Sequence, residues 1–109
     1  IFVENVAMSL RTYPIRVGSI PKLGYSGDVY PDHEEVTFND LQVDEEYTTV
    51  TKRVRRVFTW SQQQFDEAIT LNRPTLLFLN FCNYASDEQI QQICQQMGQS
   101  CLEKLSYLF

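Results

Sequence analysis

Several features that would define common protein classes are missing from this sequence. It has no apolar run approaching the roughly 20 residues that a membrane-spanning helix needs, so we expect no membrane partner. Positive charge is scarce, with nine Lys and Arg against 14 Asp and Glu and a net charge of −5. A general nucleic-acid binder would carry a broad basic face, so nucleic acid is excluded as a partner.

Cysteine and histidine are also scarce. The three cysteines, Cys82, Cys94 and Cys101, are odd in number and lack the paired spacing of a zinc site. We therefore expect reduced, partly buried thiols in a cytoplasmic protein, with no metal site of their own. The single histidine, His33, follows Pro31-Asp32 in an acidic stretch, and we expect a solvated loop residue without a catalytic role.

The length suits one domain or a piece of one. A chain of 109 residues buries enough surface for a core. It begins Ile1-Phe2-Val3 without an initiator methionine and without the features of a signal peptide, from which we expect a fragment of a longer protein. Residues 1–109 are accordingly predicted to be a single domain or fragment.

A compact basic cluster stands out against the acidic background. Four of the nine basic residues lie within positions 52–56, directly after a run of threonines in Thr48 to Thr51. Arginine offers planar pairs of donors that fit carboxylate and phosphate oxygens, and the hydroxyls add further donors. The alternative is a solvated charge run on a surface loop.

Long loops are predicted for the first half of the chain. We expect an extended segment from Ser9 to Val17, broken or at a sheet edge at Pro14. Glycines and prolines then recur through Gly18 to Asp32, which is typical of a long, turn-rich loop. Residues 33–46 are acidic, with a short turn of helix at Asn39 to Leu41.

The second half has the pattern of an α/β protein. After an extended segment from Val54 to Trp60, Ser61 followed by Gln64 predicts a helix start, and Asn72-Arg73-Pro74 predicts its end. The apolar run from Thr75 to Phe81 predicts a buried strand.

A second helix is predicted from Ser86 onward, because Ser86 and Gln89 repeat the capping pattern. Its inner stripe would be Ile90, Ile93, Cys94, Met97 and Cys101, with an interruption near Gly98. Helix, buried strand and helix together predict part of a larger mixed-sheet α/β domain, with helix–strand–helix in the second half and long loops in the first.

Three blocks resemble the C-terminal part of adenylosuccinate synthetase, the family that joins aspartate to C6 of IMP. The first is Thr12-Tyr13-Pro14-Ile15-Arg16-Val17-Gly18, similar to an aromatic-x-x-Arg-Val-Gly segment. The second, Thr51-Lys52-Arg53-Val54-Arg55-Arg56 followed by Trp60, looks like Thr-Gly-Arg-x-Arg-Arg-x-Gly-Trp. The third runs from Ala68 to Asn83, where helix, strand and a base-reading motif occur in the family's order.

The resemblance implies roles for residues of the first two blocks. Val17 and Gly18 would lie beside the ribose of the substrate nucleotide. Thr49 and Thr51 would hold aspartate, with Arg53 close to both substrates. Arg55 would lean toward the nucleoside triphosphate, where arginine stabilises the charge of phosphoryl transfer.

Two departures affect the second block. Lys52 stands where the family has glycine, which puts the local loop shape in question, and Thr59 is inserted before Trp60. For Trp60 we favour a core anchor over a ligand contact.

The third block departs at the base-reading motif. The family has Thr-Lys-Leu-Asp where this chain has Asn80, Phe81, Cys82 and Asn83. A carboxylate only accepts hydrogen bonds, whereas an amide both donates and accepts. Asn83 therefore suits adenine, Phe81 could stack on either base, and we predict ATP or dATP as the phosphate donor in place of GTP. The alternative is that Asn83 is a strand-end turn residue.

A viral branch of the family aminates dGMP, and this chain resembles that branch, with IMP kept as the other substrate. The resemblance implies Mg²⁺ held mainly by a part absent here, and a homodimer. No catalytic residue is expected in this chain, because a glycine-rich phosphate loop is lacking. The chain alone should therefore be inactive.

Two other readings stay open. The chain could be a ligand-binding module that keeps the basic loop without catalysis, or a protein-interaction module that docks Thr48 to Arg56 onto an acidic partner. Charge docking would weaken steeply with salt, whereas a shaped ligand site would weaken less.

Overall fold

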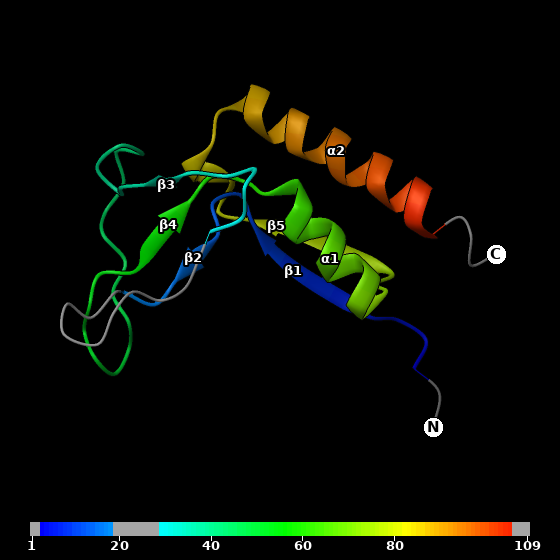
Figure 1. The fold of residues 1–109 in the computed structure, drawn as a ribbon, viewed down its shortest axis with the longest axis horizontal. Coiled ribbons are helices and arrows are strands. Elements are labelled where there is room, and N and C mark those ends of the chain that lie inside the picture. Colours follow the sequence, from blue (N-terminus) through cyan, green and yellow to red (C-terminus); the bar gives the residue numbers. More distant parts are fainter. Residues whose placement is uncertain (1–2, 19–28, 106–109) are drawn as a thin grey trace.

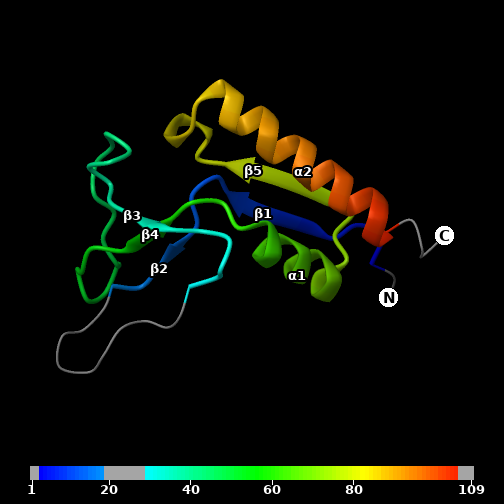
Figure 2. The same ribbon diagram turned by 45° about the horizontal axis from the view of Figure 1, so that its top comes forward.

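The computed structural model describes residues 3–18 and 29–105, with side chains described as far as Leu102. It confirms a mixed α/β organisation, with a two-stranded parallel sheet, a three-stranded antiparallel sheet and two α-helices. The elements are β1 Ala7–Arg11, β2 Ile15–Arg16, β3 Glu35–Val36, β4 Arg56–Phe58, α1 Gln62–Asn72, β5 Leu76–Asn80, the 3₁₀ turn η1 Cys82–Tyr84 and α2 Asp87–Leu105. Figures 1 and 2 show the antiparallel strands at one end of the molecule and the helices at the other.

Both helices pack on one face of the parallel sheet. Strands β1 and β5 pair from Ala7 opposite Leu76 to Arg11 opposite Asn80. Alternate side chains of these strands meet the helices in one apolar cluster of Phe65, Ile69, Ile93 and Met97 with Met8, Leu10, Leu77 and Leu79. Each fully buried large side chain of this kind stabilises the fold by about 1.5–3 kcal/mol. This cluster is the main core of the described chain.

The prediction that β5 is a buried strand is wrong for one of its faces. Leu76 and Phe78 are 47% and 54% exposed, while Leu77 and Leu79 are half-buried against the helices. The physical reason is that α1 and α2 share a single face of the sheet, so strand alternation leaves every second residue uncovered by the described residues.

The helix starts follow the predicted capping pattern. Ser61 Oγ accepts from the Gln64 amide at 3.0 Å. At the start of α2, Ser86 Oγ accepts from the Gln89 amide, and the Gln89 side chain accepts from the Ser86 amide at 2.9 Å. Helix α1 ends at Asn72, where Arg73 takes a left-handed conformation before Pro74. These starts and the stop were local signals, which is why the sequence revealed them.

Helix α2 differs from the prediction in two respects. It continues without interruption through Gly98, and Cys94, which was expected on the inner stripe, is exposed. One glycine costs a helix only about 1 kcal/mol relative to alanine, which packing of the neighbouring Ile93 and Met97 offsets. Within the described residues, no helix combines the length and apolarity that crossing a membrane requires.

A second, smaller core holds the loop-rich end. Strand β4 lies between β2 and β3, and Tyr13, Phe38 and Val57 form the buried cluster beneath them. The extended N-terminal segment breaks between β1 and β2 at Thr12 to Pro14, as Pro14 predicted. Residues Asn39 to Leu41 form a turn instead of a helix. Most of the predicted Gly18 to Asp32 loop lies outside the described residues.

Candidate functional site

The basic cluster lies on a hairpin that spans residues 46–55, called the hairpin below. Its base is closed by the Arg55 amide, which donates to the Glu46 carbonyl oxygen at 2.8 Å, and by a bridge between Tyr47 and Val54. Further out, the Thr48 amide donates to the Arg53 carbonyl oxygen at 2.8 Å. The threonine-rich turn and the arginines are therefore held on one closed element (Figure 1).

Lys52 takes the backbone conformation that glycine prefers. Its φ is 56°, in the left-handed region, and its amide donates to the Thr48 carbonyl oxygen at 3.1 Å. Thr48 Oγ1 accepts from the Arg53 amide at 3.1 Å and also shares a short hydrogen bond with Thr51 Oγ1. Lysine at the family's glycine position thus keeps a glycine-like turn, at the strain that a side chain incurs there.

Four of the predicted site residues line one shallow hollow. Its volume is about 340 Å³, and it is lined by Val17, Thr48, Thr49, Val50, Thr51 and Arg55. The Arg55 Nε atom donates to the Tyr47 carbonyl oxygen at 3.2 Å, which holds the guanidinium at the hairpin. Hydroxyls and a guanidinium around an open hollow offer the donors that a small carboxylate requires.

The first block contacts the hairpin through Gly18. A Cβ at this position would overlap the Val54 carbonyl oxygen and touch the Arg53 Cβ. Only a residue without a side chain therefore fits where the two blocks meet. Arg53 lies at this contact and does not line the hollow, so its predicted role near both substrates remains a prediction.

The base-reading motif lies at the carboxyl ends of the parallel strands, where ligands of open α/β sheets bind. Phe81 follows β5, has a φ of 58° and is 39% exposed, while Asn83 is exposed in η1. Asn80 instead lies on the sheet face, where its Nδ2 atom donates to Ser9 Oγ at 2.5 Å. The structure thus places Phe81 and Asn83 at one edge and engages Asn80 elsewhere.

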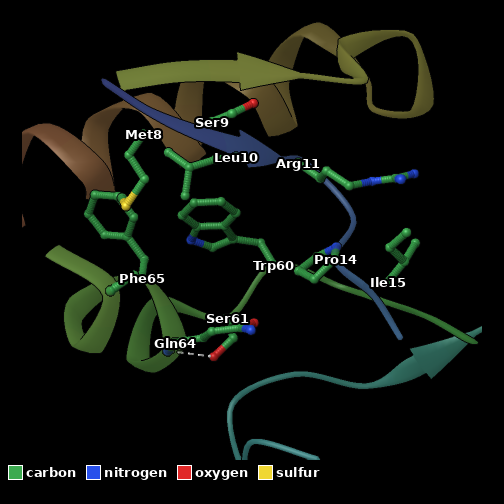
Figure 3. Close-up of a pocket in the computed structure, with 11 residues that line it drawn as sticks. Met8, Ser9, Leu10, Arg11, Pro14, Ile15, Trp60, Ser61, Gln64 and Phe65 are labelled. Carbon is green, nitrogen blue, oxygen red and sulfur yellow. Dashed lines mark hydrogen bonds between the residues drawn. The ribbon is translucent and has the colours of Figure 1, made fainter. Parts of the chain in front are cut away.

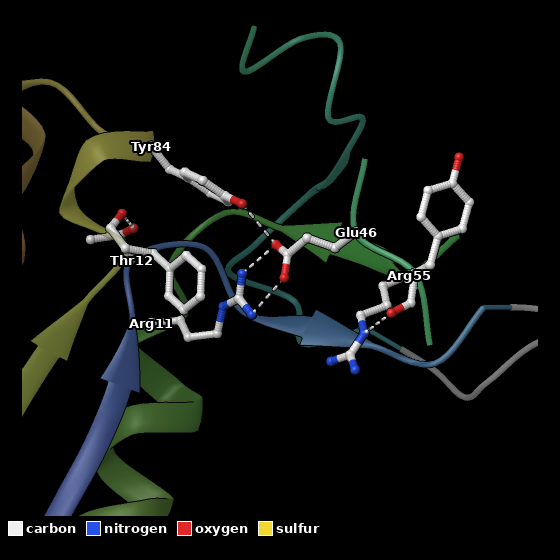
Figure 4. Close-up of polar contacts among 7 residues, drawn as sticks. Arg11, Thr12, Glu46, Arg55 and Tyr84 are labelled. Atoms are coloured by element: carbon white, nitrogen blue, oxygen red, sulfur yellow. Dashed lines mark hydrogen bonds and ion pairs between the residues drawn. The ribbon is translucent and has the colours of Figure 1, made fainter. Parts of the chain in front are cut away.

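Three residues that the sequence reading did not single out lie between the motif and the hairpin. Arg11 pairs with Glu46 through both terminal nitrogens, and the Tyr84 hydroxyl donates to Glu46 Oε2 at 3.0 Å (Figure 4). Burial acts to raise the pKa of Glu46, but the hydrogen bonds from Arg11 and Tyr84 outweigh it and lower that pKa. Burial, followed by the Glu46 carboxylate, raises the pKa of Tyr84. Only the acidity of residues 33–46 hinted at a partner for Arg11.

The prediction for His33 is wrong, because its side chain is buried. His33 stacks on Phe58, its Nε2 atom accepts from the Tyr30 amide at 3.0 Å, and its Nδ1 atom lies 3.1 Å from the Thr59 carbonyl oxygen. Since an amide can only donate and a carbonyl can only accept, the ring carries its proton on Nδ1 and is neutral. The inserted Thr59 is thereby tied to the segment before β3, which also receives a hydrogen bond from the Glu34 amide.

Trp60 is the core anchor that we favoured. It packs against the main core, and its indole Nε1 donates to Gln62 Oε1 at 3.1 Å. Together with Met8, Leu10 and Phe65 it lines an apolar hollow of about 260 Å³ between α1 and β1 (Figure 3).

No metal site is apparent in the described part of the chain. Within residues 3–18 and 29–105, no three His, Cys, Asp or Glu side chains gather as a metal site requires. We therefore assign Mg²⁺ no ligand there.

The parallel sheet edge, the hairpin and the three sequence blocks define part of a purine-nucleotide synthetase related to adenylosuccinate synthetase. Among known proteins, the chain is 51% identical over 83 residues to N6-succino-2-amino-2'-deoxyadenylate synthase of Cyanophage S-2L, covering 75% of this chain. It is 45% identical over 95 residues to the synthase of the same name from Vibrio phage phiVC8, covering 87% of this chain. No family model matches the chain.

A solved structure supports the same kinship. The chain superimposes with a TM-score of 0.82 and 44% identity on the Cyanophage S-2L succinoaminodeoxyadenylate synthetase bound to dGMP and dATP as an energy donor, covering 88% of this chain. The predicted resemblance is confirmed, including its viral branch. The chain spans about a quarter of its curated relatives, 23% of the Cyanophage S-2L protein and 26% of the Vibrio phage protein, and matches a C-terminal portion of them.

Proposed function

We propose that this chain is the C-terminal portion of a ligase that joins L-aspartate to C6 of dGMP, driven by an adenine nucleoside triphosphate. The observation that carries the proposal is the hollow formed by Thr49, Thr51 and Arg55 on a closed hairpin, next to Val17. It occurs in a chain 44% identical to a synthetase described with dGMP and dATP. Hydroxyls and a guanidinium at this hollow would hold the aspartate carboxylates.

The residues at the sheet edge would receive the triphosphate nucleotide. Phe81 offers an exposed ring face for base stacking, and the Asn83 amide can pair with one donor and one acceptor on adenine. The dATP of the related synthetase supports adenine over guanine at this position. Arg55, at the hairpin, would lie toward the phosphates.

Nucleotide titrations of the chain test this assignment. In ¹H–¹⁵N spectra, dATP should shift resonances of residues 80–84 at lower concentration than dGTP does. The matched variant Asn83→Asp should reverse this order, because a carboxylate accepts from both donors of guanine. A wild-type preference for dGTP, or an unchanged order in Asn83→Asp, would contradict the assignment.

Catalysis should require residues beyond these 109. With dATP, dGMP, aspartate and Mg²⁺, the chain should yield no succinylated product, because no described side chain is placed as a phosphoryl-transfer base. Formation of product by the chain alone would refute this. We expect the unpaired thiols to suit a reducing compartment such as the cytoplasm, and the homodimer implied by the family is testable by sedimentation of the chain.

A further inference from the structure

The cluster around Arg11 joins three segments that are far apart in sequence. Arg11 ends β1, Glu46 begins the hairpin 35 residues later, and Tyr84 lies in η1. The two terminal nitrogens of Arg11 donate to the two Glu46 oxygens at 3.1 and 2.5 Å, and the Tyr84 hydroxyl donates to Glu46 at 3.0 Å. A two-pronged pair fixes the guanidinium plane as well as its position.

The same guanidinium covers one face of Phe81. The Arg11 Cζ atom lies 3.6 Å from the centre of the ring, and the edge of Tyr84 meets the ring as well. The Phe81 backbone is held too, because Thr12 Oγ1 donates to its carbonyl oxygen at 2.6 Å. A base could therefore stack only on the exposed side of Phe81, at an angle that Arg11 sets.

Glu46 transmits this arrangement to the hairpin. Its side chain holds Arg11, while its carbonyl oxygen accepts from the Arg55 amide at the hairpin base. The hollow that would hold aspartate and the ring that would stack on the base thus meet in one residue. Figure 4 shows Arg11 and Tyr84 on one side of Glu46 and Arg55 on the other.

We propose that Arg11 is a positioning residue of the nucleotide site, which orients Phe81 and, through Glu46, couples it to the hairpin. The nucleotide part of this inference rests on the proposed function, whereas the coupling of the two segments does not. Arg11 acts through Phe81 and Glu46 and needs no contact with substrate.

A matched control lies in the same chain. Arg56 also pairs with a glutamate, Glu35, at 2.9 Å, and its Cζ atom lies 5.0 Å from the ring centre of Phe58. This pair joins β4 to β3 and contacts neither Phe81 nor Glu46 in the described structure. Arg56→Met therefore removes an arginine of similar surroundings without touching the proposed coupling.

Amide hydrogen exchange measures the coupling in the chain without ligand. In Arg11→Met, the amides of Thr48, Arg55 and Tyr84 should exchange at least threefold faster, whereas Arg56→Met should leave these three unchanged. The double variant Arg11→Met with Glu46→Gln avoids an unpaired carboxylate and should show the same pattern if the single variant folds poorly. Faster exchange in only one of the two segments would overturn the coupling.

Reversing the pair separates the ionic link from the ring contact. The double variant Arg11→Glu with Glu46→Arg should restore slow exchange in the hairpin, but its dATP affinity should stay at least fivefold below that of the wild type, because no cation covers Phe81. Recovery of full dATP affinity would overturn the positioning role. If the wild-type chain binds no dATP, the proposed function is wrong, while coupled exchange would still establish the link between the segments.

Discussion

The helical half of the molecule, α1, β5 and α2, and the loop-rich half, β2, β3, β4 and the hairpin, are stabilised in different ways. The helical half buries Phe65, Ile69, Ile93 and Met97 in one apolar cluster between two helices and a sheet. The loop-rich half has a smaller apolar cluster and relies on hydrogen bonds such as those of His33 and on the pair of Arg11 with Glu46. Apolar packing stabilises strongly without specifying direction, whereas hydrogen bonds position side chains. The candidate ligand residues of the hairpin accordingly lie in the half with more polar contacts.

The largest effect should come from the apolar core. Ile69 is fully buried, so Ile69→Ala should lower the free energy of unfolding by about 2–5 kcal/mol through lost burial and a cavity. Leu71 in the same helix is 83% exposed, and Leu71→Ala should stay within about 0.5 kcal/mol of the wild type. Urea denaturation checks both, and equal losses would show that the core is not where the structure places it.

A polar substitution should have a smaller effect in the loop-rich half. His33→Phe keeps a ring against Phe58 but removes both ring hydrogen bonds, and should cost about 1–3 kcal/mol. Tyr30→Phe serves as the control, since it removes only an exposed hydrogen bond to Glu67. Urea denaturation with equal midpoints for wild type and His33→Phe would mean that the buried histidine contributes only its ring stacking.

Backbone strain at the hairpin should be measurable as well. Lys52 has a positive φ, so Lys52→Val should be about 1–2 kcal/mol less stable than Lys52→Gly, although both variants lose the same charge. Thermal unfolding of the two variants checks this difference. If valine were tolerated as well as glycine, the turn would not have the left-handed conformation.

The smallest effect concerns the contact between the halves. Asp32 accepts from the Ser61 hydroxyl at 2.6 Å and from the Gln63 amide at 2.9 Å at the start of α1. Burial acts to raise the pKa of Asp32, but these hydrogen bonds prevail and lower it.

A lowered folded-state pKa stabilises the fold above the unfolded value of about 3.9, and this stabilisation is lost as pH falls through the folded-state pKa. Asp32→Asn should therefore flatten the acid limb of a plot of unfolding free energy against pH. Leu71→Ala should leave the shape of that plot unchanged. An acid limb as steep in Asp32→Asn as in the wild type would remove Asp32 from the contact.

The sequence predicted those parts whose signals are local. Ser61 and Ser86 marked both helix starts within one turn, and Pro14 marked the break between β1 and β2. The threonine and arginine cluster was recognised as a donor-rich loop, and the structure gathers four of its predicted site residues at one hollow. The burial of His33 escaped prediction, because its partner Thr59 lies 26 residues away.

The exposed face of β5 was misjudged for a related reason. The run from Leu76 to Leu79 is apolar at every position, and only the packing of both helices on one side decides which side chains are covered.

By itself, the sequence determined the helices, the donor-rich turn and the kinship with nucleotide synthetases, because capping, periodicity and motif order are properties of neighbouring residues. Only the tertiary structure decided that Arg11 lies on Phe81 and pairs with Glu46, and that Lys52 adopts a glycine-like turn. Contacts between residues 35 and 70 positions apart depend on how the sheet and loops close, and no local pattern encodes that closure.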